Sequence, residues 1–272
     1  MTWIALRVTP DSNRDGVIAA LFASGSQGVQ EDGPAVITHF PGDTRIDDVR
    51  DAVIHADPNA AIAIGSAPDI DYSQWVASVS AQRAGELVIV PPWLAANRDP
   101  QKTIIIDPAM AFGTGEHATT RGVIRLMQGV IRRGDVVADL GAGSAVLSIA
   151  AVKLGASRVA AVEIDHDSIA NADENVRVNG VSDSVEVIEG DATVILPLLA
   201  PVRVVLANII SSVLRVMLPA IKSALGPDGQ AILSGLLAEE RATMLAALES
   251  GGWCVQREDT EDAWWSVQIA SR

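Results

Sequence analysis

The chain has 272 residues, of which 49% are hydrophobic, and it carries a formal net charge of −14 and a single cysteine. This length and apolar content predict one large and one small folded domain, whereas the acidic charge disfavours direct binding to nucleic acid, because phosphate recognition needs clustered Lys and Arg. One cysteine excludes an internal disulfide and disfavours a cysteine-based metal site. No apolar run approaches the ~20 residues of a membrane span, so the expected location is the reducing cytoplasm.

Residues 1–66 are predicted to form a small α+β domain. The order is strand, helix, strand, strand, helix, strand, with the strands expected at residues 3–8, 28–31, 36–40 and 60–64. Apolar residues at helical spacing, such as Val17 and Leu21, mark the helices between them. This order is typical of a ferredoxin-like fold.

Residues 67–102 are predicted to be a linker and residues 103–272 a large α/β domain. The linker contains one short strand, 87–90, which two prolines end. In the large domain helical stripes alternate with strands expected at 136–140, 158–162, 185–188, 202–207 and 230–234. This alternation predicts an open, mostly parallel sheet with helices on both faces. Two final runs without a helix between them, 253–256 and 264–269, predict an antiparallel edge pair.

The most informative motif ends the strand predicted at 136–140, where Asp139 precedes a turn that contains Gly141 and Gly143. In a strand–loop–helix nucleotide site the glycines let the backbone approach the ligand, and the N–H groups of the next helix suit a phosphate. A carboxylate at that place would repel a pyrophosphate and attract a cation. S-adenosylmethionine (SAM) carries an ammonium and a sulfonium, so Asp139 indicates SAM. The alternative is a structural glycine turn with solvated acids.

A second acid, Glu163, ends the next predicted strand, 163 − 141 = 22 positions after Gly141. An acid at this spacing binds ribose hydroxyls in NAD and SAM sites alike. Val146 stands where the dinucleotide fingerprint has its third glycine, and its branched side chain would obstruct a pyrophosphate. Glu163 therefore supports an adenosine ligand, while Asp139 and Val146 disfavour an NAD-dependent oxidoreductase.

Residues 107–120 join a glycine-containing loop to the start of a helix and are predicted to close over the ligand. We expect Thr119 and Thr120 to offer hydroxyls to the carboxylate of the cofactor and Phe112 to shield the sulfonium from water. His117 is either a helix cap or a catalytic group. No nucleophile pairs with it and no second histidine lies at metal-ligand spacing, so no metal is expected.

Asn208 and Ile209 directly follow the apolar run 202–207. Ligands of open α/β sheets bind beyond the carboxyl ends of the strands, so we expect Asn208 to face the reacting groups. Its side-chain carbonyl and the backbone carbonyl of Ile209 can accept N–H bonds from an amine and direct the nitrogen lone pair at a methyl group. These two residues are therefore the catalytic candidates, and a simple polar cap on a buried strand is the alternative.

Together these residues resemble the ribosomal protein L-eleven methyltransferases, the PrmA family, along nearly the whole chain. The most specific match is AFGTGEHATT at 111–120, and others are MTWIALRV, GVQEDGP, VPPW, Asn208-Ile209-Ile210 and Trp265. The resemblance implies a class I, Rossmann-like methyltransferase domain that holds SAM and a small ferredoxin-like domain that binds the substrate. It also implies that Thr120, Gly141, Glu163 and Asn208 contact the cofactor. Ala145 is a departure, because the family usually has a third glycine there.

The predicted function is SAM-dependent N-methylation of lysine side chains, the N-terminal amine or both, on a basic ribosomal protein. A lysine amine has a pKa of about 10.4 and must lose a proton before it attacks the methyl carbon. Bulk water is the expected proton acceptor. The alternatives are a methyltransferase of the same fold that acts on another protein or small molecule, and a SAM-binding regulator without chemistry. A monomer without nucleic-acid or membrane partners is expected.

Overall fold

The computed structural model of the chain describes residues 3–26, 29–42, 44–66, 79–107 and 115–272. Contacts between residues divide the chain into two compact units, Met1–Val79 and Ser80–Arg272. Within the described ranges, no helix has both the length and the apolar character that crossing a membrane requires.

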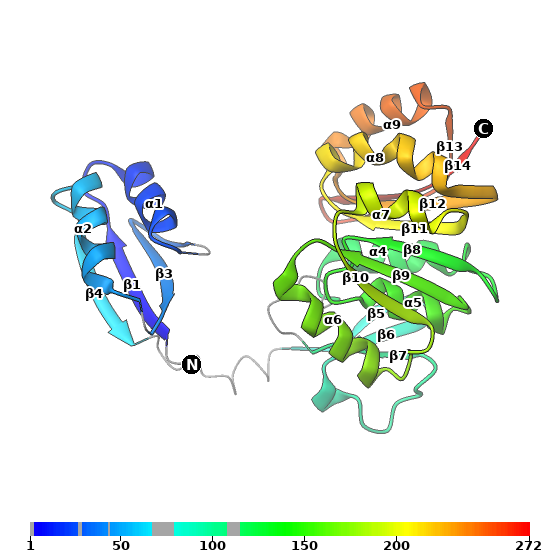
Figure 1. Cartoon of the computed structure of the whole chain (residues 1–272), viewed down its shortest axis with the longest axis horizontal. Coiled ribbons are helices and arrows are strands. Elements are labelled where there is room, and N and C mark those ends of the chain that lie inside the picture. Colours follow the sequence, from blue (N-terminus) through cyan, green and yellow to red (C-terminus); the bar gives the residue numbers. More distant parts are fainter. Residues whose placement is uncertain (1–2, 27–28, 43, 67–78, 108–114) are drawn as a thin grey trace. The chain divides into compact units, whose positions relative to one another are not determined.

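The first unit is a four-stranded antiparallel sheet with two helices (Figure 1). Its elements in chain order are β1 (Trp3–Thr9), α1 (Arg14–Ala23), β2 (Gln30–Asp32), β3 (Ala35–Pro41), α2 (Ile46–Ala56) and β4 (Ala61–Ser66). The strands lie in the order β2-β3-β1-β4. Leu6 and Phe40 of the strands share one buried cluster with Val17, Leu21 and Val53 of the helices. The predicted ferredoxin-like fold is confirmed.

One carboxylate fixes the start of α1. Oδ2 of Asp57, which directly follows α2, accepts the backbone N–H groups of Asp11 and Ser12 at 2.9 Å and of Asn13 at 3.0 Å. These bonds, with that from Asn13 contributing most, lower the pKa of Asp57 to about 2. The carboxylate therefore ties the loop between β1 and α1 to the end of α2.

The second unit contains a seven-stranded sheet in the order β10-β9-β8-β11-β12-β14-β13 (Figure 1). The strands are β8 (Val136–Leu140), β9 (Arg158–Glu163), β10 (Val185–Glu189), β11 (Val202–Asn208), β12 (Leu225–Leu237), β13 (Trp253–Glu261) and β14 (Trp264–Ser271). Strands β8 to β12 pair in parallel, whereas β14 pairs antiparallel with β12 and β13. The predicted parallel sheet and its antiparallel edge pair are confirmed.

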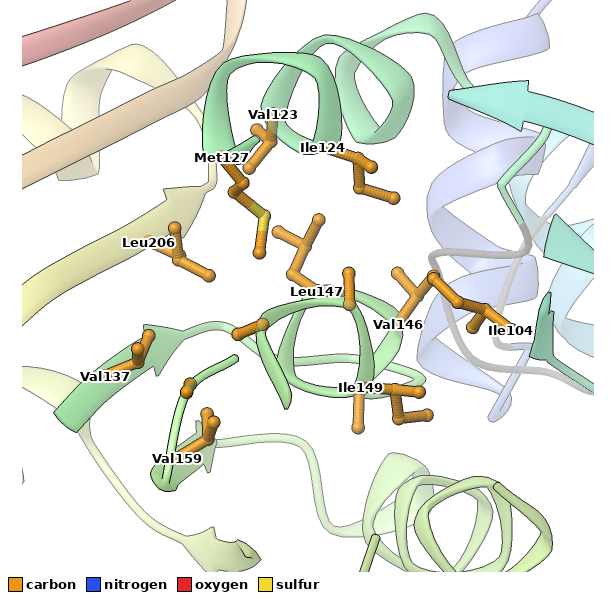
Figure 2. Close-up of a cluster of buried hydrophobic side chains, with 14 of the residues drawn as sticks. Ile104, Val123, Ile124, Met127, Val137, Val146, Leu147, Ile149, Val159 and Leu206 are labelled. Atoms are coloured by element: carbon orange, nitrogen blue, oxygen red, sulfur yellow. The ribbon is translucent and has the colours of Figure 1, made fainter. Parts of the chain in front are cut away.

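Helices cover both faces of this sheet. One face packs against α4 (Ala118–Met127), α5 (Val146–Lys153) and α6 (His166–Val178). The other face packs against α7 (Ala192–Leu199), α8 (Ser211–Ala224) and α9 (Arg241–Ser250), and the 3-10 helix η2 (Ala238–Glu240) directly precedes α9. Successive residues of a strand point to opposite faces, so Val137 packs with the α4–α6 cluster and Ala138 with the α7–α9 cluster. Figure 2 shows Val123 and Met127 of α4 above Leu147 of α5 and Leu206 of β11.

A short three-stranded sheet extends the first of these clusters. It consists of β5 (Gln82–Ala84), β6 (Leu87–Val90) and β7 (Thr103–Ile105), with the 3-10 helix η1 (Pro92–Leu94) between β6 and β7. Leu87, Ile89 and Ile104 are buried in the same cluster as α4 and α5. The structure therefore differs from the predicted linker in residues 80–102, whereas residues 67–78 of that linker lie outside the described residues. Residues 80–102 fold with the second unit, because β6 pairs with β7 and its apolar side chains need that core.

Candidate functional site

Three predicted site residues lie at the carboxyl ends of neighbouring parallel strands. Asp139 is the penultimate residue of β8, and Glu163 and Asn208 are the last residues of β9 and β11. In the register of the sheet, Asp139 lies between Ala161 of β9 and Leu206 of β11. The topology therefore brings the two acids and the amide to one edge of the sheet, where open α/β sheets bind their ligands.

The glycine turn after β8 lies tightly against β9. Gly141 and Gly143 have φ values of +69° and +52°, in the left-handed region that favours glycine. The backbone N–H groups of Gly141 and Ala142 both donate to the carbonyl of Val162, at 2.9 and 3.0 Å. Ala145, where the sequence lacks the third glycine, also has a positive φ of +63°. The turn thus keeps the shape of a glycine-rich loop despite that alanine.

Asp139 is completely buried, and among the described residues only one of its two carboxylate oxygens accepts a hydrogen bond. Ser148 Oγ donates a hydrogen bond to Oδ2 at 2.7 Å. Oδ1 is buried and has no hydrogen-bond partner among the described residues. Burial raises the pKa of Asp139 to about 6; the charge of Glu163 adds to this rise, and the Ser148 hydrogen bond opposes it. A cationic ligand would satisfy this oxygen and favour the ionised form.

Glu163 holds the glycine turn in place. Its Oε2 accepts the N–H of Gly143 at 2.8 Å, and its Oε1 accepts those of Ile164 and Asp165 at 2.8 and 2.9 Å. The structure thus brings Gly143 and Glu163 into direct contact. A carboxylate has about four lone-pair sites, so Glu163 retains capacity to accept hydroxyl groups from a ligand.

The start of α4 carries the two predicted threonines. Thr120 is completely buried, and its Oγ1 has no hydrogen-bond partner within the described ranges. Thr119 Oγ1 lies 2.7 Å from Nδ1 of His117, which caps the helix by accepting the Thr119 N–H. Burial, with a smaller contribution from Arg121, lowers the pKa of His117. Phe112, the fourth residue predicted in this segment, lies outside the described residues.

The loop after β11 lies against the carboxyl-terminal part of β12, at Ser234 and Gly235. Asn208 Oδ1 is buried without a hydrogen-bond partner in the described part of the chain, and the Ile209 N–H donates to the Ser234 carbonyl at 3.2 Å. Gly235 has a φ of +80°, and a Cβ there would lie 2.5 Å from the carbonyl oxygen of Ile209. Only glycine permits this approach, so Gly235 sets the position of the Ile209 carbonyl.

These loops surround a cavity of about 700 Å³, here called the carboxyl-edge cavity. Its lining comprises His117, Thr119, Gly141, Val162, Ile164, Gly190, Asp191, Ala192, Thr193, Asn208, Ile209, Ile210, Val213, Met217, Gly235 and Trp264. The size is typical of a small-molecule site. Thr119, Gly141, Asn208 and Ile209 were predicted from the sequence. Thr120, Asp139, Gly143 and Glu163 are not part of the lining, although Thr119 and Val162, which directly precede Thr120 and Glu163, are part of it, and so is Gly141, which lies two positions from Asp139 and from Gly143.

Sequence reasoning missed the loop after β10, together with Ile164 and Trp264. Gly190 and Asp191 line the cavity, and the Asp191 side chain caps α7 by accepting the Thr193 N–H at 2.8 Å. The available signal was Gly190-Asp191 at the carboxyl end of a predicted strand. Trp264 offered no comparable signal, because it reaches the cavity only through the antiparallel pairing of β14.

A second cavity, of about 520 Å³, lies at the opposite ends of the strands. Residues such as Val136, Arg158 and Val202, which begin β8, β9 and β11, line it. Ligands of parallel α/β sheets bind at the carboxyl ends, and none of the predicted site residues lines this cavity. The carboxyl-edge cavity is therefore the candidate functional site.

Comparisons with known proteins agree with this architecture. The model of the family described as "Ribosomal protein L11 methyltransferase (PrmA)" matches residues 9–272. A relative of that name from Pelotomaculum thermopropionicum is 36% identical over 222 residues, which cover 79% of this chain and 70% of the relative. Another from Rhodopseudomonas palustris is 36% identical over 244 residues, which cover 86% of this chain and 83% of the relative.

A solved structure supports the same assignment. The crystal structure of a ribosomal protein L11 methylase from Lactobacillus delbrueckii subsp. bulgaricus matches with a TM-score of 0.62 and 28% sequence identity, over 71% of this chain and 100% of that one. The sheet order and this likeness confirm the predicted class I methyltransferase fold. The chain is a methyltransferase and belongs to the ribosomal protein L11 methyltransferase family.

Proposed function

We propose that the carboxyl-edge cavity binds SAM and that the protein transfers its methyl group to amino groups of ribosomal protein L11. One observation carries the proposal. Oδ1 of Asp139, Oγ1 of Thr120 and Oδ1 of Asn208 are all buried without hydrogen-bond partners in the described ranges, and all lie at or beside the carboxyl edge of the sheet. A buried polar atom without a partner costs about 1–3 kcal/mol, so a ligand that donates hydrogen bonds is expected there.

The charge of these groups supports a cationic cofactor. Asp139 is anionic at neutral pH, and the three unpartnered atoms are oxygens, which accept hydrogen bonds from an ammonium group. Bound SAM would supply a methyl group attached to its sulfonium, and transfer of that methyl group would leave a neutral thioether. A pyrophosphate would instead meet the Asp139 carboxylate without a compensating cation. The residues present therefore fit SAM better than a dinucleotide.

Glu163 and the lining residues beside it support an adenosine group. Glu163 keeps lone pairs for ribose hydroxyls while it holds the Gly143 N–H. Beyond it, β10 is the outer neighbour of β9, and Gly190 and Asp191 at its end continue the lining. Ile164, which lies between these loops and is 70% exposed, offers an apolar surface for the base. We assign the adenine to this side and the methyl group to the side of Asn208.

Asn208 and Ile209 are proposed to orient the amine. The Asn208 side-chain carbonyl and the Ile209 backbone carbonyl accept N–H bonds from the substrate amine, which directs the nitrogen lone pair toward the methyl carbon. The same carbonyls stabilise the positive charge that develops on nitrogen. Most of the rate is expected from proximity and alignment, and bulk water accepts the proton.

The substrate assignment follows the names of the relatives and the charge of the chain. The matched relatives are named for action on ribosomal protein L11. The net charge of −14 suits a basic protein partner, because opposite charge raises the rate of encounter. We assign substrate recognition to the first unit and the lysine side chains or N-terminal amine of L11 as acceptors.

The test is to incubate the protein with methyl-labelled SAM and a mixture of ribosomal proteins. We expect label on L11, with mass spectrometry showing additions of whole methyl groups to amines. Thermal stabilisation by SAM and not by NAD would support the cofactor separately. Label on a different protein would refute the substrate, and stabilisation by NAD alone would refute the cofactor.

A further inference from the structure

The aromatic side of the carboxyl-edge cavity is formed by Trp264 and His117. Their ring centroids lie 4.6 Å apart with an interplanar angle of 66°, an edge-to-face contact. Both residues line the cavity, as do Asn208 and Ile209. The imidazole is itself fixed, because its Nδ1 lies 2.7 Å from Thr119 Oγ1. The indole therefore packs against an immobilised neighbour inside the candidate site.

Ion pairs hold the hairpin that carries Trp264 against α4. Glu261, which pairs with Trp264 across the β13–β14 hairpin, accepts a hydrogen bond of 2.9 Å from Arg121 Nε. Arg125 Nε donates to Asp259 Oδ2 at 2.8 Å. The side chains of Arg121 and Glu261 are only 15% and 28% exposed, so water screens this pair less than a surface pair. The position of the indole relative to α4 is therefore well defined.

The apolar part of the cavity lining suits the alkyl stem of an amine. Ile210, Val213 and Met217 supply apolar surface. Asp191 is the single acid among the described lining residues, and its side chain already caps α7. A cationic nitrogen beside Trp264 would therefore have an aromatic ring as its neighbour, and indole is the strongest cation–π partner among the side chains.

We propose that Trp264 binds the amine-bearing side chain of the substrate by a cation–π contact, with His117 as a positioning residue for the indole. This inference rests on the proposed methylation of an amine. The nitrogen is positively charged when it arrives as an ammonium and again after it has gained a methyl group. The indole face would attract it in both forms, whereas the alkyl stem would lie along the apolar wall.

The first test uses the wild-type protein and a pair of matched probes. Choline carries a trimethylammonium group, and 3,3-dimethylbutan-1-ol is its uncharged isostere. At saturating SAM, choline is expected to inhibit methylation competitively against the protein substrate, with an inhibition constant about tenfold below that of the alcohol. Equal inhibition by the two probes, or none by choline, would overturn the proposal.

The second test compares variants. Trp264→Leu is expected to raise KM for the protein substrate about tenfold, and Trp264→Phe, which retains a ring, to raise it less. SAM affinity should be unchanged in both. The matched control is Trp93→Leu, because Trp93 is 37% exposed and is not among the lining residues. If the wild type methylates its substrate normally and Trp264→Leu has an unchanged KM, the role of Trp264 is refuted and the proposed function stands. If the wild type does not methylate the protein substrate, both the proposed function and this inference are refuted.

Discussion

Ser148 Oγ donates a 2.7 Å hydrogen bond to Oδ2 of Asp139, while the other oxygen of this carboxylate remains buried and without a partner in the described structure. The serine comes from α5, so the helix that follows the glycine turn also orients the acid that precedes it. Oδ1 is thereby left as the acceptor for a ligand. The chemistry of the candidate site depends on this asymmetry.

Replacement of Asp139 by asparagine tests the cationic-ligand assignment. Asp139→Asn keeps the shape of the side chain and removes its charge, so the protein is expected to lose about tenfold to a hundredfold in SAM affinity, as measured by calorimetry. The matched control is Asp135→Asn, at the other end of β8, where the side chain accepts the Arg132 N–H. An Asp139→Asn variant with wild-type SAM affinity would contradict the assignment.

The affinity for SAM should depend on pH. Burial raises the pKa of Asp139 to about 6, so the carboxyl is ionised above that pH and neutral below it. A cationic ligand prefers the ionised form, so affinity is expected to fall about tenfold between about pH 7 and about pH 5. Calorimetry across this range measures the effect. The Asp139→Asn profile should be flat; if it retained the wild-type slope, a group other than Asp139 would be responsible.

Asn208 is expected to act on turnover more than on cofactor binding. Asn208→Ala removes a carbonyl that would stabilise the charge arriving on nitrogen, so kcat should fall about a hundredfold while most SAM affinity is retained. Single-turnover methylation assays with calorimetry separate the two effects. Asn208→Asp, which keeps an oxygen acceptor, should recover part of the activity. Equal activity in the alanine variant would mean that Asn208 only caps β11.

The contact between Gly235 and Ile209 provides a test of positioning. In Gly235→Ala the new Cβ would lie 2.5 Å from the Ile209 carbonyl oxygen, and the Ile209 backbone would have to move. Displacement of a positioning group by about 1 Å can cost about 10²-fold in rate, so a fall of that order in kcat is expected. Gly226→Ala on the same strand is the control, because its Cβ would meet only ordinary contacts, the nearest at 3.6 Å. A normal rate in Gly235→Ala would show that the carbonyl position is unimportant.

In the first unit, Asp57→Ala should loosen the start of α1. The variant loses the acceptor for the N–H groups of Asp11, Ser12 and Asn13, so these amides should exchange hydrogen faster. The pKa of Asp57 in the folded state is lowered to about 2. Its contribution to stability is therefore fully present above the ordinary carboxyl pKa and is lost as the pH falls from there through about 2. Asp51→Ala, at an exposed position of α2, is the control. Unchanged protection of residues 11–13 in Asp57→Ala would contradict the assigned role.

The sequence alone determined the order of the elements and the chemistry at the ends of three strands. Alternating and helical periodicities predicted the ferredoxin-like unit and the parallel sheet, because both patterns are local consequences of which face is buried. Asp139, Glu163 and Asn208 were identified because each stands at the end of an apolar run. Their grouping in the candidate site follows from the rule that parallel strands present their carboxyl ends at one edge.

Tertiary structure decided what depends on residues distant in the sequence. The sequence predicts a linker over 67–102 with one short strand, 87–90, whereas residues 80–102 belong to the second unit, where β6 pairs with β7 and packs into the core. Trp264 enters the cavity only because β14 pairs between β12 and β13. The unpartnered oxygen of Asp139 likewise depends on Ser148 from the next helix. Sequence periodicity reports which face of an element is buried, but pairing partners and unsatisfied atoms are fixed by the packing of the whole unit.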